Sequence, residues 1–317
     1  MDRRLVLELV RVTEAAAIAC YPMIGRGDGK EADRRAVAAM RAAFDRVPFR
    51  GTVVIGEGER DEAPMLYIGE KVGPSNDDLP EVDIAVDPLE GTDLCAGGWP
   101  GALAVLAAAN RGDLLHCPDT YMEKIATGPA GRGVVSLDAP PEDNVRALAS
   151  ALGRRPSDVT VVVLDRPRHE ELIRRLRGAG ARVLLVDDGD VAPAVAAGFP
   201  DSGIDMLYGK GGAPEGVLAA AALHCLGGHF EGRLAFRNEA ERERARGMGM
   251  ADPDGLLTLS DLVRGEVIFV ATGVTTGSLL RGVRRVGDRL TTHSIALRST
   301  TGTIRYVEGS VRAERFL

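Results

Sequence analysis

The sequence predicts an α/β protein whose N-terminal half has an α+β character. Two observations lead to this prediction. Near the N-terminus, the apolar residues Leu5, Leu9, Val12 and Ala16 recur at helical spacing. After residue 158, short β-branched runs alternate with helical patterns, as in sheets that carry helices on their faces. The hydrophobic content of 45% and the charged content of 27% are typical of a globular protein.

In the first half, the hydrophobic periodicity predicts helices over residues 3–19, 31–45 and 141–152. Apolar or alternating runs between turn residues predict the strands. We expect them at 51–55, 82–86, 102–108, 121–126 and 133–137.

In the second half, strands are expected at 159–164, 182–186 and 204–208, and helices at 168–177, 191–197 and 215–226. This alternation predicts a parallel or mostly parallel sheet. A glycine-rich loop is expected at 209–213. The stretch 239–246 interleaves arginine with glutamate and is interpreted as a solvated helix. The tail is expected to form hairpin strands at 267–272, 294–297 and 303–307.

The length of 317 residues suggests two domains. Gly153 and Pro156 interrupt the pattern near residues 150–158, which predicts one domain over 1–155 and another over 156–317.

The cellular setting follows from features that the sequence lacks. Asp2 and Glu8 interrupt any signal-peptide core, and the longest apolar stretch, 102–109, is too short to span a bilayer. The four cysteines show no paired spacing, which favours a reducing cytoplasm, and Cys95 is interpreted as a small buried residue. The net charge of −7 and the lack of a basic face argue against nucleic acid and membrane partners.

The most informative segment is 87–92, Asp-Pro-Leu-Glu-Gly-Thr, which follows the apolar run 82–86. Asp87 and Glu90 offer hard oxygen ligands, which suit Mg²⁺ or Mn²⁺ better than zinc. Thr92 adds a hydroxyl and a backbone N–H beside them. A polar loop whose Asp caps a helix is the alternative. The strand before the turn and its Pro and Gly favour a ligand site for phosphate-ester hydrolysis.

Three further acidic residues lie where strands or turns end. Glu57 stands between two glycines after an apolar strand, although this pattern alone favours a solvent-facing turn. Glu215 falls in the first turn of a predicted helix, where it either stabilises the helix or reaches a metal. For Asp33, a helix-stabilising role and a ligand role are equally supported by the local sequence.

Several other chemistries are disfavoured because their motifs are missing. There is no GxGxxG fingerprint at Gly56 or Gly209 and no GxxxxGK[ST] loop. There is also no HExxH and no GxSxG elbow, and the five histidines are interpreted as packing or surface residues.

The 87–92 segment resembles the metal motif of the lithium-sensitive sugar-phosphatase superfamily. Glu90 in place of a more usual Asp, with segments 56–59 and 208–216, resembles the class II fructose-1,6-bisphosphatases. The resemblance extends through 61–73, 121–122, 166–169 and 188–191, and so through nearly the whole chain. It implies a five-layered α/β/α/β/α sugar-phosphatase fold, with a metal-binding first domain and a sugar-phosphate-binding second domain.

The resemblance also implies roles for particular residues. The implied metal ligands are Asp33, Glu57, Asp87, Glu90 and Glu215, with Mn²⁺ or Mg²⁺ as the cofactor. Catalytic roles are assigned to Glu57, Asp61 and Thr92, of which Glu57 and Thr92 orient the attacking water. The implied substrate-binding residues are Glu90, Gly91, Thr92, Tyr121, Arg166, Pro167, Arg168, Asp188, Gly189, Asp190 and Gly212. Arg166 and Arg168 have guanidinium groups suited to the phosphate that is not cleaved.

The sequence departs from this family at three positions. Gly29 stands where the family often carries Lys, with Lys30 one position later; Asp93 follows Thr92 where Asn or Arg is expected; and Arg166 replaces a common Lys.

The predicted function is metal-dependent hydrolysis of the 1-phosphate of fructose 1,6-bisphosphate, a gluconeogenic reaction, by a homo-oligomer (dimer or tetramer). The alternative is hydrolysis of sedoheptulose 1,7-bisphosphate, alone or as a second activity, because an enzyme discriminates only weakly between two sugars that differ by one carbon. An inositol monophosphatase and a non-catalytic sugar-phosphate-binding protein are less favoured, since a monophosphate leaves the second phosphate clamp unused.

Overall fold

The computed structural model describes residues 1–58 and 64–315. Contacts divide the chain into two compact units. Unit 1 comprises Met1–Leu115 and Arg264–Leu317, and unit 2 comprises His116–Val263. The sequence predicts a boundary near residue 155, but the chain divides at two other points. The reason is long-range pairing: strand 267–273 returns to pair with strand 103–110, which local sequence patterns do not reveal.

Unit 1 contains a mostly antiparallel sheet with the strand order β12-β13-β11-β4-β3-β1-β2, to which β14 adds by pairing with β13. The bounds of these strands are β1 (Arg50–Ile55), β2 (Lys71–Val72), β3 (Glu81–Glu90), β4 (Leu103–Asn110), β11 (Val267–Gly273), β12 (Arg284–Val286), β13 (Arg289–Arg298) and β14 (Thr303–Arg312). The expected tail strands are therefore present, and β13 and β14 form the expected hairpin.

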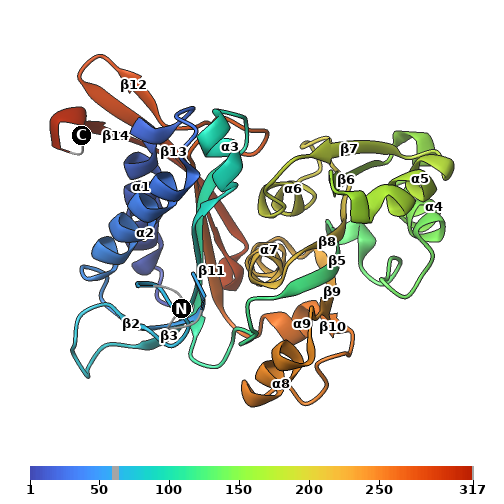
Figure 1. Cartoon of the computed structure of the whole chain (residues 1–317), viewed down its shortest axis with the longest axis horizontal. Helices are drawn as coiled ribbons and strands as arrows, with labels where there is room; N and C mark the ends of the chain where they lie inside the picture. The colour runs from blue at the N-terminus through green and yellow to red at the C-terminus, as the bar shows by residue number, and fades with distance from the viewer. Residues whose placement is uncertain (59–63, 316–317) are drawn as a thin grey trace. The chain divides into compact units, whose positions relative to one another are not determined.

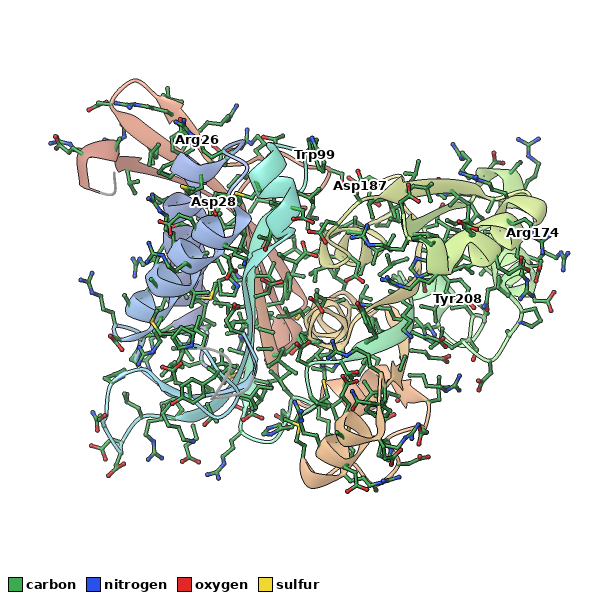
Figure 2. All side chains as sticks on the ribbon, in the orientation of Figure 1. Arg26, Asp28, Trp99, Arg174, Asp187 and Tyr208 are labelled. Atoms are coloured by element: carbon green, nitrogen blue, oxygen red, sulfur yellow. The ribbon has the colours of Figure 1, made fainter. Side chains whose placement is uncertain are left out.

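Helices α1 (Leu5–Cys20) and α2 (Gly29–Phe44) pack together and cover one face of this sheet (Figure 1). Helix α1 buries Leu5, Leu9, Val12 and Ala16, so the predicted apolar stripe is confirmed. Asp28, labelled in Figure 2, caps α2 by accepting a hydrogen bond from the Glu31 N–H at 3.0 Å. The short elements of this unit are η1 (Tyr21–Met23), α3 (Thr92–Gly97), η5 (Ser299–Thr301) and η6 (Ala313–Arg315).

Unit 2 contains a second sheet with the strand order β10-β9-β5-β8-β6-β7. Its strands are β5 (Tyr121–Thr127), β6 (Thr160–Leu164), β7 (Arg182–Val186), β8 (Met206–Gly212), β9 (His229–Ala235) and β10 (Leu257–Thr258). The pairs β6–β7 and β6–β8 are parallel, whereas β5–β8, β5–β9 and β9–β10 are antiparallel. The expected mostly parallel sheet is therefore mixed, because β5 and β9 insert beside β8 from other parts of the chain.

Helices lie on both faces of this sheet (Figure 1). One layer holds α4 (Pro141–Ala151) and α5 (Glu170–Gly178), and the other holds α6 (Val191–Ala196) and α7 (Ala213–Leu226). The remaining elements are η2 (Pro129–Gly131), η3 (Pro156–Asp158), η4 (Pro167–His169), α8 (Glu239–Gly247) and α9 (Leu259–Leu262). Unit 1 thus has one sheet covered by helices on one face, and unit 2 has one sheet with helices on both faces (Figure 1).

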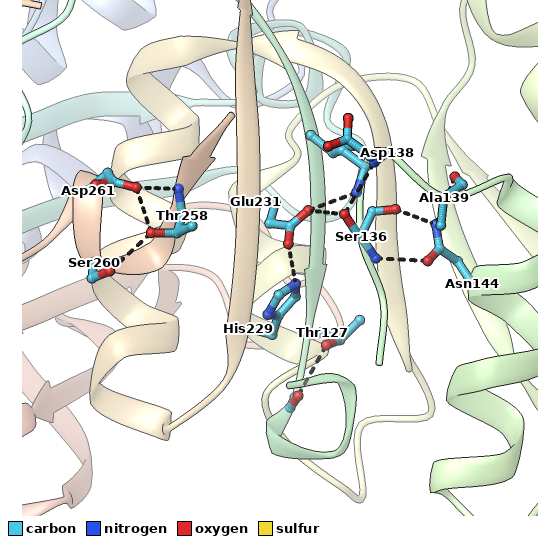
Figure 3. A network of polar contacts seen from close by, with 12 residues as sticks. Thr127, Ser136, Asp138, Ala139, Asn144, His229, Glu231, Thr258, Ser260 and Asp261 are labelled. Atoms are coloured by element: carbon cyan, nitrogen blue, oxygen red, sulfur yellow. Dashed lines mark hydrogen bonds and ion pairs between the residues drawn. The ribbon is translucent and has the colours of Figure 1, made fainter. Parts of the chain in front are cut away.

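Two local predictions are wrong. Residues 133–137 do not form a strand, because the Val134 and Val135 N–H groups donate to the Gly131 carbonyl and side chains accept from the next two N–H groups. The Ser136 N–H donates to Asn144 Oδ1 at 2.9 Å and the Leu137 N–H to Glu231 Oε2 at 2.8 Å (Figure 3). The expected loop at 209–213 is instead the end of β8, which pairs with β5 as far as Gly212. In the described ranges, no helix is both long enough and apolar enough to cross a membrane.

Candidate active site

The irregular end of β3 and the turn at Gly91 hold Thr92 in a defined orientation; residues 87–90, expected as a turn, continue the strand with a register shift between Asp87 and Glu90. The Leu89 N–H donates to Asp87 Oδ1 at 3.0 Å, and Gly91 adopts a left-handed conformation with φ of 79°. The Thr92 hydroxyl then donates to the Leu89 carbonyl at 3.0 Å. Because this hydrogen bond uses the hydroxyl proton, the oxygen lone pairs of Thr92 can accept a hydrogen bond from a water molecule. The turn therefore suits a residue that orients an attacking water.

Glu57 follows β1, and Asp87 lies near the end of β3, the neighbouring strand that runs in the same direction. Strand β1 is parallel to β3, with Ile55 opposite Ala85, so both side chains lie two residues beyond the paired positions. Gly56 admits no side chain, because a Cβ there would lie 2.0 Å from the Leu66 carbonyl oxygen. The structure therefore brings these two predicted ligands to the same end of the sheet, as expected for ligand sites at strand ends.

Glu90, the last residue of β3, has a side chain that is only 2% exposed. A buried carboxylate is costly unless it is bound to a cation or hydrogen-bonded. Its position at the start of the Gly91 turn agrees with both the metal role and the substrate role predicted for it. Asp61, predicted from the sequence to be catalytic, lies outside the described residues.

Helix α2 places Asp33 one turn beyond a contact with Thr92. A Cβ added to Gly29 would lie 2.9 Å from Thr92 Cγ2, so the first turn of α2 packs against the start of α3. Burial raises the pKa of the half-buried Asp33 carboxyl. The departure at Gly29 has a structural counterpart here: the glycine allows this close approach between the two helices.

In unit 2, the predicted substrate residues lie at one edge of the sheet. Segments 166–168 and 188–190 follow β6 and β7, which are parallel, with Leu164 opposite Val186. Gly212 ends β8, which is also parallel to β6, and Tyr121 lies opposite Gly212 at the start of β5. We call this side the β6–β8 edge. Ligands of open α/β sheets gather outside such carboxyl ends of strands.

A buried lysine joins two parts of this edge. Lys124 is 1% exposed, and its Nζ lies 2.7 Å from Asp190 Oδ2 and donates to the Gly212 carbonyl at 2.8 Å. Gly211 leaves room for this pair, since a Cβ there would lie 2.1 Å from Asp190 Oδ2. Lys124 therefore holds Asp190 and Gly212, both predicted to bind substrate, in fixed positions.

Glu215 lies in the first turn of α7, and its carboxylate folds back over Gly212, where a Cβ would lie 1.9 Å from Oε2. Burial raises the pKa of Glu215, while the nearby Lys124 charge opposes this shift. Among the described residues, the buried Oε2 of Glu215 and Oδ1 of Asp190 have no hydrogen-bond partner. Buried oxygens of this kind are available to a ligand or a cation.

The loop that carries Arg166 and Arg168 is fastened to β8 through His169. The Lys210 N–H donates to His169 Nε2 at 2.8 Å, and His169 Nδ1 lies 2.7 Å from the Leu164 carbonyl. These partners require a neutral ring with its proton on Nδ1. Burial lowers the pKa of His169, which agrees with the neutral form. The Arg168 guanidinium adds two hydrogen bonds to the Lys210 carbonyl, at 2.8 and 3.2 Å.

The predicted metal ligands fit a hard divalent cation by their chemistry. All five are carboxylates, which Mg²⁺ and Mn²⁺ prefer, and the Glu215 Oε2 atom described above is buried without a partner. Within residues 1–58 and 64–315, no three His, Cys, Asp or Glu side chains are already gathered as a metal-binding group.

Four residues of the β6–β8 edge carry no role predicted from the sequence: Lys124, His169, Lys210 and Arg237. For Lys124 there was a signal, because it alternates with Met122 and Ala126 on the side of the expected strand that should be buried. The other three owe their positions to pairing between distant segments, which leaves no local pattern.

Comparisons with known proteins define the family. Residues 3–311 match the family described as bacterial fructose-1,6-bisphosphatase, glpX-encoded, so the chain belongs to this family of phosphatases. It is 48% identical to the D-fructose 1,6-bisphosphatase class 2/sedoheptulose 1,7-bisphosphatase of Synechococcus sp. (strain JA-3-3Ab), over 97% of this chain and 95% of that protein. It is 45% identical to the protein of the same name from Synechococcus elongatus, over 97% and 96%. The resemblance seen in the sequence is therefore confirmed at the level of the family.

Among solved structures, an extragenic suppressor from Pyrococcus furiosus is 16% identical, with 60% of this chain and 68% of that chain covered and a TM-score of 0.31. The extragenic suppressor protein suhB from Bartonella henselae is 15% identical, with 62% and 74% covered and a TM-score of 0.33.

Proposed function

We propose that this protein hydrolyses the 1-phosphate ester of fructose 1,6-bisphosphate, giving fructose 6-phosphate and phosphate, with Mg²⁺ or Mn²⁺ as cofactor. The observation that carries the proposal is the family match over residues 3–311. The structure adds support within each unit, because predicted site residues lie at strand ends where ligands bind.

We assign metal binding to Asp33, Glu57, Asp87, Glu90 and Glu215. Bound divalent cations neutralise phosphate charge and make a bound water more acidic. Thr92, with its proton donated to Leu89, accepts a hydrogen bond from the attacking water, and Glu57 orients the same water. The backbone N–H groups of the α3 start bind phosphoryl oxygens as charge develops on them. Asp61 keeps its catalytic assignment as part of the proposal.

We assign recognition of the sugar and its second phosphate to the β6–β8 edge. Asp188 and Asp190 accept hydrogen bonds from sugar hydroxyls, and Gly212 allows the ligand to approach the backbone. Arg166 and Arg168 bind the phosphate that stays on the product, since planar guanidinium groups match phosphate oxygens. The ion pair with Lys124 balances the charge of Asp190, so that this carboxylate repels the polyanionic substrate less.

Sedoheptulose 1,7-bisphosphate is the second candidate substrate. The supporting observation is that both relatives, at 48% and 45% identity, carry a name that joins the two activities. We also propose that the protein acts in gluconeogenesis, in the cytoplasm, as a homo-oligomer. The four cysteines are free, which suits a reducing compartment.

The test is phosphate release from three substrates, fructose 1,6-bisphosphate, sedoheptulose 1,7-bisphosphate and inositol 1-phosphate, each with Mg²⁺ and with Mn²⁺. We expect turnover of at least the first, abolished by EDTA and restored by excess metal. Turnover of inositol phosphate alone would replace the proposal with a monophosphatase. No turnover under any condition, together with sugar-phosphate binding, would indicate a non-catalytic binding protein.

A further inference from the structure

Three cationic side chains surround one exposed aromatic ring at the β6–β8 edge. The ring belongs to Tyr121, which is 36% exposed. The guanidinium carbons of Arg168 and Arg237 lie 5.2 and 5.8 Å from its centroid, and Lys210 Nζ lies at 5.5 Å. We call these four residues the Tyr121 cluster. Each cation is in the range of a cation–π contact.

The backbone brings these side chains together from four segments. Tyr121 begins β5, which pairs on one side with β8, placing Glu123 opposite Lys210, and on the other with β9, placing Tyr121 opposite Ala235. Arg237 follows the end of β9 by two residues, and Arg168 lies in η4 after β6. Because all four segments meet at the same edge of one sheet, the cluster is a property of unit 2 alone.

Hydrogen bonds hold the cluster in place without a ligand. Arg168 donates twice to the Lys210 carbonyl, and the Lys210 N–H donates to His169. Arg237 donates to the Asp119 carbonyl at 3.1 Å and forms an ion pair with Glu241. Glu241 is itself fixed by the Thr120 hydroxyl at 2.6 Å. The two guanidinium groups are therefore already in place when an anion binds, which lowers the entropic cost of binding.

The charge of the cluster is only partly balanced. Within the described residues, Arg237 has a carboxylate partner, whereas Arg168 donates to a carbonyl and Lys210 forms no ion pair. Three like charges around one ring repel each other, and an anion with several oxygens relieves this repulsion. Phosphate groups fit because charge-assisted hydrogen bonds from arginine and lysine to phosphate are strong.

We propose that Lys210 and Arg237, together with Arg168, bind the phosphate of the sugar bisphosphate that is not hydrolysed. This inference rests on the proposed function, and it adds two binding residues that neither the sequence motifs nor the family match identified. The three cations come from separate segments around the ring. A phosphate on a sugar that is one carbon longer therefore still lies within reach of some of them. The cluster thus accepts both fructose and sedoheptulose bisphosphates.

The test uses Lys210→Met and Arg237→Met in the full-length protein, with two readouts. The first is the KM and kcat for each bisphosphate in the presence of Mn²⁺. The second is the Kd for fructose 6-phosphate, which carries only the retained phosphate, measured by calorimetry in EDTA. We expect each variant to weaken fructose 6-phosphate binding about tenfold or more and to raise both KM values similarly, with little change in kcat.

The matched control is Arg242→Met. Arg242 also lies over an aromatic ring, Phe236, at 5.4 Å, but it is paired with Glu239 and Asp254 and lies outside the cluster. We expect this variant to bind and turn over substrate like the wild type. Arg237→Met leaves Glu241 without its cation, which destabilises unit 2. Arg237→Lys keeps a positive charge at this position and is measured as well. A thermal unfolding curve of each variant, Lys210→Met included, shows whether it is folded.

The inference is overturned if the folded Lys210 and Arg237 variants match Arg242→Met in both readouts. A change in kcat without a change in KM or Kd also overturns it, because it would point to an effect on the chemical step. If the wild-type protein releases no phosphate from either bisphosphate, the proposed function fails. Even then, tighter fructose 6-phosphate binding by the wild type than by Lys210→Met would support the phosphate site itself.

Discussion

The two sheets hold their carboxylates in different ways. In unit 1, Asp87 and Glu90 lie on a strand and turn whose own backbone organises them, as in the hydrogen bond from the Leu89 N–H to Asp87. In unit 2, Asp190 is bound by Lys124, a buried side chain from a different strand. Both regions place acids at strand ends, and in unit 2 a buried ammonium group fixes one of them.

This difference suggests a division of labour. Carboxylates presented by a strand end and a turn are oxygen ligands of the kind that divalent cations prefer, which suits the chemical step. Carboxylates beside buried or clustered cations form a more nearly neutral edge, which suits a sugar that carries phosphate. We therefore expect substitutions in unit 1 to act mainly on kcat and substitutions in unit 2 to act mainly on stability and KM.

The largest effect is expected for Lys124→Met. Removing one partner of a buried ion pair leaves Asp190 charged and without compensation, which costs about 3–5 kcal/mol of the free energy of unfolding. Urea unfolding followed by circular dichroism measures this loss. The double variant Lys124→Met/Asp190→Asn removes both charges and should recover part of it.

The control for this comparison is Arg175→Met, which breaks the partly exposed ion pair between α5 and Glu142 on α4. Surface pairs of this kind contribute about 1 kcal/mol or less. Equal destabilisation by Lys124→Met and Arg175→Met would contradict the view that unit 2 depends on its buried lysine.

For Thr92→Ala we expect kcat to fall by about 10², because the group that positions the attacking water is lost. By the relation between rates and barriers this corresponds to about 2.7 kcal/mol. Steady-state kinetics with fructose 1,6-bisphosphate and Mn²⁺ provides the measurement. Thr92→Ser retains a hydroxyl and should keep most of the activity; full activity in Thr92→Ala would discard the assignment.

Glu57→Gln should also lower kcat, on the order of 10², and it should raise the Mn²⁺ concentration needed for half-maximal activity, because a carboxylate ligand becomes a neutral amide. A metal titration of activity measures both effects. Glu81→Gln, at the opposite end of β3, is the matched control, since Glu81 pairs with Arg111 at the surface. Identical metal titrations for the two variants would remove Glu57 from the ligand set.

The smallest effect is a pH dependence that arises from His169. Burial lowers its pKa, so below about pH 6.5 the unfolded chain takes up a proton that the folded chain does not bind. This contribution to stability is therefore complete above that pH and is lost as the pH falls, by at most about 1.4 kcal/mol per pH unit. Unfolding curves at pH 7.5 and 5.5 should differ less in His169→Gln than in the wild type. His116→Gln, at an exposed position, should keep the wild-type difference.

Much of the candidate site could be proposed from the sequence because its residues follow local rules. The apolar run before Asp87 predicted the strand, and the Pro and Gly around Glu90 predicted the turn that presents Thr92. The Gly-Glu-Gly at Glu57 predicted a sharp bend after β1, and a Cβ at Gly56 would indeed collide with the Leu66 carbonyl. These features depend only on residues that are close together in the sequence.

By itself, the sequence determined the long helices, most strands and the family, because periodicity and motifs act over a few positions, whereas residues 87–90 of the expected turn continue β3. Tertiary structure alone decided where the units divide, that the second sheet is mixed, and that Lys124, His169, Lys210 and Arg237 join the β6–β8 edge. These outcomes depend on hydrogen bonds between strands far apart in the chain. The free energy of such pairing comes from burying whole faces of a sheet, so it cannot be predicted from any single segment of the sequence.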